Sequence, residues 1–124
     1  MSSGKNQPIF SKNGLCKVKG FKGRIFELQK STWEDHIIKD RPRWHLREQF
    51  DKVIETLKQP DYILRSPKEH YVVSYVKKYS NLYIWNTVTA IAYLYVLVNL
   101  KNNNIRTIYD NPKLKRWECI WPKK

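Results

Sequence analysis

The chain has 124 residues, which is the length of about one domain, and its 24 Lys and Arg against 11 Asp and Glu give a net charge of +13. Because 41% of the residues are hydrophobic and 14% aromatic, with only 4 Gly and 6 Pro, disordered, collagen-like and low-complexity classes are excluded. So large a positive surplus favours a polyanionic partner, nucleic acid or an acidic membrane surface, over a basic face that only keeps the protein soluble.

The N-terminal part of the chain is basic and loosely patterned. Residues 1–24 contain six cations and no acid, and we expect residues 1–23 to form a partly flexible segment ahead of a single domain over residues 24–124. No apolar run follows the first cation, so no secretory signal is predicted. Short strands are expected at residues 16–19 and 24–28, the second of them at a sheet edge.

Two helices are predicted over residues 31–59. Ser31 and Glu34 fit a capping box at the start of the first helix, and Pro42 suits the first turn of the second. On the first helix, Trp33, His36 and Ile37 share one stripe, which places His36 beside core residues. The second helix carries an apolar stripe that we expect to be core: Leu46, Phe50, Val53, Ile54 and Leu57.

The remainder of the chain predicts a β-meander. Strands are expected at residues 61–65, 70–78, 82–89, 92–100, 105–109 and 117–121. A helix over residues 80–93 is an alternative, because part of that stretch also fits a helical stripe. Residues 79–100 lack charge, but polar residues interrupt them, so buried strands fit better than a membrane span. Helices followed by strands predict an α+β fold, with two N-terminal helices packed on one face of an antiparallel sheet.

The two cysteines give no sign of a metal site. Cys16 and Cys119 are far apart, and no other ligands are spaced to join them. We therefore expect no metal, no cofactor and a cytoplasmic protein with reduced thiols.

Several short motifs, spread over residues 24–121, are similar to those of a known nuclease group. They are residues 33–38 (Trp-Glu-Asp-His-Ile-Ile), 59–63 (Gln-Pro-Asp-Tyr-Ile), 75–78 (Tyr-Val-Lys-Lys), 95–98 (Tyr-Val-Leu-Val), 105–109 (Ile-Arg-Thr-Ile-Tyr) and Trp121. Together they resemble the phage- and mobile-element-associated branch of the barnase/EndoU/colicin/RelE-like nucleases. The resemblance implies two helices on a four-stranded antiparallel sheet and metal-independent RNA cleavage, with His36, Lys77 and Thr107 as catalytic residues.

The chemistry of these residue types agrees with that implication. Cleavage of RNA by its own 2′-hydroxyl needs a base, an acid and donors for the phosphoryl oxygens, and histidine suits either proton role near neutral pH. Strand alternation pairs Tyr75 with Lys77 on one face and Thr107 with Tyr109 on another strand. His36 is the first candidate; packing in the core is its alternative role, and His45 and His70 are expected at the surface or at a strand start.

Other residues are candidates for holding RNA. Forked guanidinium donors near the helix junction suit phosphates, although neighbouring acids offer them partners, and exposed aromatic rings suit bases. The predicted RNA-binding residues are Arg41, Arg43, Arg47, Tyr75, Arg106 and Tyr109.

Three functions are therefore compared. The first is a toxin- or effector-like endoribonuclease that acts on RNA and is paired with a cognate inhibitor protein. The second is a module that binds RNA or DNA without cutting it, and the third is a small interaction protein. The sequence gives no oligomeric state. The enzyme hypothesis requires His36, Lys77 and Thr107 to meet in one cleft.

Overall fold

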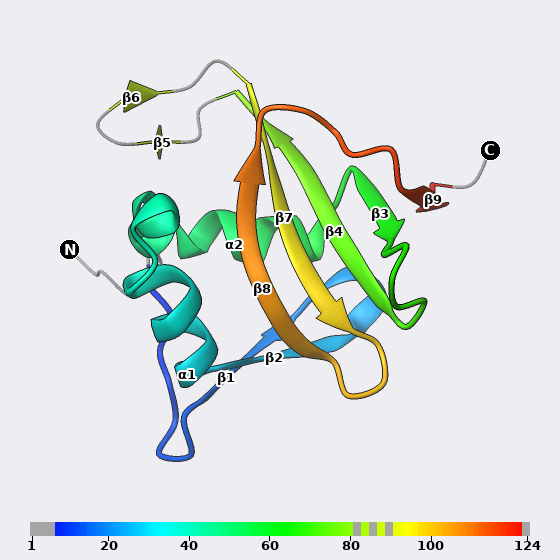
Figure 1. Ribbon diagram of the computed structural model, residues 1–124. Helices are drawn as coiled ribbons and strands as arrows, with labels where there is room; N and C mark the ends of the chain where they lie inside the picture. Colours follow the sequence, from blue (N-terminus) through cyan, green and yellow to red (C-terminus); the bar gives the residue numbers. More distant parts are fainter. Residues whose placement is uncertain (1–6, 81–82, 85–86, 89–90, 123–124) are drawn as a thin grey trace.

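The computed structural model describes residues 7–80, 83–84, 87–88 and 91–122. One seven-stranded sheet forms the centre of the fold (Figure 1). Its strands are β1 (Leu15–Lys19), β2 (Ile25–Gln29), β3 (Tyr62–Arg65), β4 (Val72–Tyr79), β7 (Ala92–Asn99), β8 (Asn104–Asn111) and β9 (Glu118–Trp121). They lie in the order β1-β2-β8-β7-β4-β3-β9. Every neighbouring pair is antiparallel except β2 and β8, which are parallel and meet at Glu27 and Asn104.

The helical part lies between β2 and β3 and is made of short pieces. They are α1 (Lys30–Trp33), the π-helical turn η2 (Glu34–Ile38), the 3-10 helix η3 (Arg41–Glu48) and α2 (Phe50–Lys58), while a further 3-10 turn, η1 (Phe21–Gly23), joins β1 to β2. The expected capping box is wrong, because the helix already begins at Lys30 and no described side chain caps it. The expected single second helix is also wrong, because its backbone leaves helical geometry at Gln49.

The predicted fold class, two N-terminal helices on an antiparallel sheet, is therefore corrected. The sheet is mixed and seven-stranded, and two strands precede the helices. Val18 of β1 is buried in the main core, so residues 15–19 are part of the sheet. β2 lies between β1 and β8 and is not an edge strand. Sequence patterning did not reveal this pairing, because Glu27 and Asn104 are its only register pair.

Residues 82–89 were expected to add one strand to this sheet. Their described residues instead form a separate two-stranded hairpin of β5 (Tyr83–Ile84) and β6 (Thr87–Val88). The predicted strand and its helical alternative also included residues that lie outside the described part of the chain: 81–82, 85–86 and 89–90. Within the part of the chain that the structure describes, no helix is long and apolar enough to cross a membrane.

The sheet has an inner and an outer face with separate apolar clusters. The inner face packs on α2, which passes behind the long strands in Figure 1. The predicted stripe is confirmed for Leu46, Phe50, Val53 and Leu57, which are buried there, while Ile54 is half-buried at the margin. The outer face carries a smaller cluster around Leu64, Val76 and Tyr95. The two faces therefore offer different surfaces to a ligand.

A bulge in β8 changes which side chains face inward. Leu97 is opposite Thr107, but Val98 is opposite Ile105, so Arg106 is an extra residue in its strand. Bulges of this kind redirect the side chains that follow them. Ile105 and Ile108 consequently both lie in the inner core, whereas Thr107 borders a pocket with the outer-face residue Tyr109.

Buried tyrosines give the fold a dependence on alkaline pH. Tyr79 donates its hydroxyl hydrogen bond to the Lys52 carbonyl at 2.9 Å, and burial raises its pKa far above the ordinary value near 10. Burial likewise raises the pKa of Tyr109 to about 12.

We predict that the free energy of unfolding falls as pH rises above about 10, because the unfolded tyrosines then lose protons that the folded ones keep. For Tyr79 alone the loss approaches about 1.4 kcal/mol per pH unit. Urea unfolding at pH 8 and at pH 11 measures this fall in the free energy of unfolding. Tyr79→Phe should show a smaller fall between these pH values, and an unchanged fall in this variant would contradict the assignment.

Candidate active site

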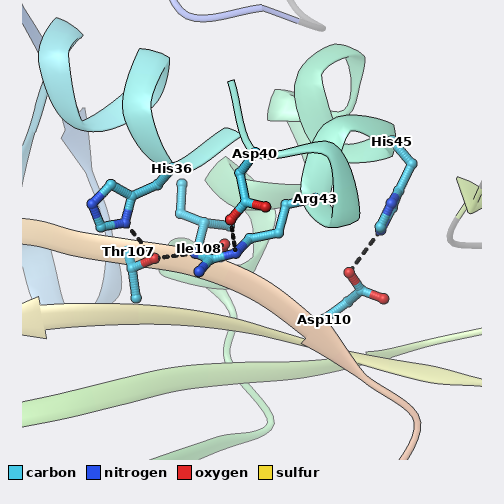
Figure 2. Close-up of polar contacts among 7 residues, drawn as sticks. All are labelled: His36, Asp40, Arg43, His45, Thr107, Ile108 and Asp110. Carbon is cyan, nitrogen blue, oxygen red and sulfur yellow. Dashed lines mark hydrogen bonds and ion pairs between the residues drawn. The ribbon is translucent and has the colours of Figure 1, made fainter. Parts of the chain in front are cut away.

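Three side chains from separate segments meet at the middle of β8 (Figure 2). The Nδ1 atom of His36 lies 2.9 Å from Thr107 Oγ1. The Arg43 Nη1 donates to the same hydroxyl oxygen and, at 3.2 Å, to the carbonyl of Ile108. Residues 71 positions apart in the sequence are therefore in direct contact. The predicted pair of His36 and Thr107 does meet.

The edge of β8 explains why these residues meet. Because β2 pairs with β8 at one position, the rest of this strand edge has no strand partner among the residues that the structure describes. Unpaired edges need a cover for their backbone groups. The segments η2 and η3 lie along this edge (Figure 1), and Arg43 binds the Ile108 carbonyl there.

One further contact orients Arg43 within the helical part, and another fixes η3 on β8. Asp40 Oδ2 lies 3.0 Å from Arg43 Nε, which directs the guanidinium toward Thr107. His45 Nε2 is 2.7 Å from Asp110 Oδ1, and the two side chains are only 5% and 13% exposed. The expectation of a surface role for His45 is therefore wrong: its ring is buried against the sheet. Figure 2 shows both contacts on the same side of β8.

A pocket of about 410 Å³ lies beside His36 and Thr107 on the outer face of the sheet. Lys68, Arg106 and Lys115 supply its positive charge, while Glu69 is the one carboxylate among its described lining residues. The Tyr71 hydroxyl donates to Glu69 at 2.6 Å, and this hydrogen bond, helped by Arg106, lowers the pKa of Glu69. The remaining surplus of cations suits a phosphate group.

Aromatic rings form the wall of the pocket around Lys115. The rings of Tyr95 and Tyr109 are stacked, with centroids 5.0 Å apart. The Lys115 ammonium lies 4.7 Å from the Tyr109 centroid and 4.5 Å from that of Trp117. Such cation–π contacts stabilise an ammonium group, but desolvation by burial still lowers the pKa of Lys115. Of these residues, Tyr109, Lys115 and Trp117 line the pocket.

The geometry leaves one nitrogen of His36 for a ligand. Its Nδ1 is held by Thr107, and its Nε2 has no hydrogen-bond partner among the described residues. A threonine oxygen has two lone pairs and one proton, so Thr107 is able to accept from a protonated Nδ1 while it accepts from Arg43. Nε2 of neutral His36 is then a base, and the hydroxyl keeps the ring in place through both protonation states.

Lys77 does not join this site. Its Nζ lies 3.0 Å from the Gln59 carbonyl and 3.7 Å from an Asp61 oxygen. The residue opposite it in the sheet is Leu94, which belongs to the inner core, whereas Thr107 is opposite Leu97 of the outer cluster. Lys77 and Thr107 are therefore on opposite faces, and the predicted three-residue cleft is wrong.

Some of the predicted RNA-binding residues lie at the outer pocket or contact Thr107, and the others lie elsewhere. Arg106 and Tyr109 line the outer pocket, and Arg43 contacts Thr107. Arg47 is half-buried on η3 and does not line the pocket, while the side chain of Arg41 lies outside the described residues. Tyr75 lies on the inner face beside Phe26. His70 is exposed and does not line the pocket, and its ring lies against Tyr71.

Sequence reasoning missed Lys68 and Lys115. Both lie in loops, where no periodic pattern assigns a side chain to a face. The one available signal for Lys115 was its place in the basic and aromatic run Lys-Leu-Lys-Arg-Trp at residues 113–117. Comparison with protein-family models, characterised proteins and solved structures finds no match to this chain. The nuclease resemblance therefore depends on the sequence motifs alone.

The shared acceptor at Thr107 yields a test of the site. Thr107→Val removes the oxygen that both His36 and Arg43 use, so we expect a loss of about 1–3 kcal/mol in the free energy of unfolding. Thr107→Ser keeps the oxygen, so its free energy of unfolding should stay close to that of the wild type. Urea denaturation measures stability, and the nitrogen chemical shifts of the His36 ring report whether its Nδ1 has lost a partner. If Thr107→Val and the wild type have equal free energies of unfolding and equal His36 ring nitrogen shifts, the contact is contradicted.

Proposed function

We propose that this protein binds single-stranded RNA in the outer pocket and cleaves it without a metal ion. The observation that carries the proposal is the contact of His36 with Thr107 at the wall of a pocket that also holds three cations. The net charge of +13 supplies long-range attraction for a polyanion. Trp117 offers a ring face for a base, since bases stack on aromatic side chains in single-strand binding proteins.

The cleavage step uses the 2′-hydroxyl of the RNA. His36 Nε2 removes the proton from this hydroxyl, the 2′-oxygen bonds to phosphorus, and the bond from phosphorus to the 5′-oxygen breaks. The leaving oxygen takes a proton from the Lys115 ammonium, whose lowered pKa favours donation. Lys68 and Arg106 face the charge that grows on the phosphoryl oxygens. The products are a 2′,3′-cyclic phosphate and a 5′-hydroxyl.

A module that binds RNA without cutting it is the second candidate. The position of Lys77 favours it, because that cation is absent from the cleft that the enzyme hypothesis required. The revised set of His36, Thr107 and Lys115 replaces the three predicted residues, and the experiments below separate cleavage from binding.

We predict that the purified protein cuts single-stranded RNA in excess EDTA and leaves cyclic phosphate ends. His36→Ala should lower the cleavage rate by two to four orders of magnitude with little change in RNA affinity, because a proton-transfer group acts mainly in the transition state. Gel analysis of an end-labelled RNA measures the rate, and fluorescence anisotropy measures affinity.

Two matched variants are controls for this assay. Lys77→Ala removes a cation from the opposite face and His70→Ala removes a histidine outside the pocket, so both should cleave at the wild-type rate. An RNA with a 2′-deoxy group at the cleavage position should bind and remain intact. Binding without cleavage by the folded wild type would reject the enzyme in favour of the binding module.

RNA affinity should depend steeply on salt, because each cation that contacts a phosphate releases a counterion. Each of Lys68→Ala, Arg106→Ala and Lys115→Ala should reduce the slope of log K against log salt by about 0.7 for a single strand. Lys12→Ala, at an exposed position outside the pocket, should leave the slope unchanged. Anisotropy titrations between low and physiological salt give the slopes. Equal slopes in the wild type and the pocket variants would place the RNA elsewhere.

A further inference from the structure

A second and larger pocket lies on the inner face of the sheet. It has a volume of about 630 Å³ and shares no lining residue with the outer pocket. One side is formed by η1 and the start of β2, and the other by β3, β9 and the turn between β7 and β8. The volume is in the range of small-molecule sites. Neither His36 nor Thr107 lines this pocket.

Aromatic rings from the two ends of the sheet meet at this pocket. Phe21 of η1 and Trp121 of β9 pack edge to face, with centroids 4.7 Å apart. Both are only partly buried, so they expose ring surface to a ligand. Aliphatic residues complete the apolar wall: Ile25, Ile63, Val73, Leu100 and Ile120. Such a wall suits a flat ring.

The buried wall also contains one unused polar group. Tyr75 is 4% exposed and its ring packs against Phe26 at 5.0 Å. Its hydroxyl makes no hydrogen bond with any residue that the structure describes, although the pocket reaches this side chain. A polar atom on an otherwise apolar wall favours a ligand whose ring has a polar edge.

Positive charge lies at the rim of the pocket. Arg24 and Lys22 line it together with no acidic residue, and neither forms an ion pair with a described residue. The Arg24 Nη1 donates to Asn103 Oδ1 at 2.6 Å, which orients the guanidinium while other N–H groups stay available. A forked guanidinium is well suited to a phosphate.

We propose that the inner pocket is a binding site for a nucleoside monophosphate. The base packs against Phe21 and Trp121 with its polar edge at the Tyr75 hydroxyl, and the phosphate binds Arg24 and Lys22. The same chemistry is present in a free mononucleotide and in the 5′-phosphorylated end of a nucleic acid strand. The proposal is independent of RNA cleavage, because the two pockets are on opposite faces of the sheet.

Isothermal titration of the His36→Ala protein tests this site without interference from cleavage. The probes are the four nucleoside 5′-monophosphates, the matching nucleosides and inorganic phosphate. We expect at least one monophosphate to bind more tightly than its nucleoside and than phosphate. Arg24→Gln should weaken it about tenfold or more, and Tyr75→Phe, which keeps the ring on Phe26, should weaken it severalfold. Lys78→Gln, an exposed residue outside both pockets, is the charge-matched control and should bind as before.

A 5′-phosphorylated deoxyoligonucleotide separates the two sources of the ligand. If the oligonucleotide competes with the bound mononucleotide, and stops competing when its 5′-phosphate is removed, the ligand is a strand end. If the phosphorylated oligonucleotide does not compete, the ligand is the free nucleotide. Absence of binding by all four monophosphates at millimolar concentration would overturn the proposal. Equal binding by Arg24→Gln and by Lys78→Gln would do so as well, with the circular dichroism of each variant confirming its fold.

Discussion

The open edge of β8 is the constraint on which the candidate site depends. A strand edge exposes backbone groups that need hydrogen-bond partners. Strand β2 pairs with β8 only at Asn104, where β8 begins. The structure covers the remainder with η2 and η3, and Arg43 supplies the donor for the Ile108 carbonyl. A contact that completes the sheet is thus also the contact that holds Thr107 beside His36.

The bulge at Arg106 determines what this arrangement can do. Without the extra residue, strand alternation would place Ile105 and Thr107 on the same face. Either Ile105 would then leave the inner core or Thr107 would leave the outer pocket. The bulge lets Ile105 and Ile108 remain in the inner core while Thr107 borders the outer pocket. Arg106 itself is left exposed at the rim, with Glu69 as its ion-pair partner at 3.6 Å. One irregularity therefore serves both packing and the pocket.

Sequence reasoning found the pair His36 and Thr107 through the family resemblance, but periodicity alone had no means to join residues 71 positions apart. Alternation correctly placed Tyr75 and Lys77 on one face; it did not show that this is the inner face, remote from Thr107. The apolar stripe from Leu46 to Leu57 was predictable because burial imposes its spacing. The break at Gln49 was not, because that stripe continues across it.

The distribution of acidic residues explains how a strongly basic chain forms both a stable edge and open cationic pockets. Asp40 orients Arg43 at the start of η3, and Asp110 fixes His45 of η3 to β8. Asp61 neutralises Lys77 on the opposite face of the sheet. The outer pocket keeps one carboxylate, Glu69, and the inner pocket has none among its lining residues. Asp40, Asp61 and Asp110 therefore stabilise the scaffold and do not neutralise the cations that line the two pockets.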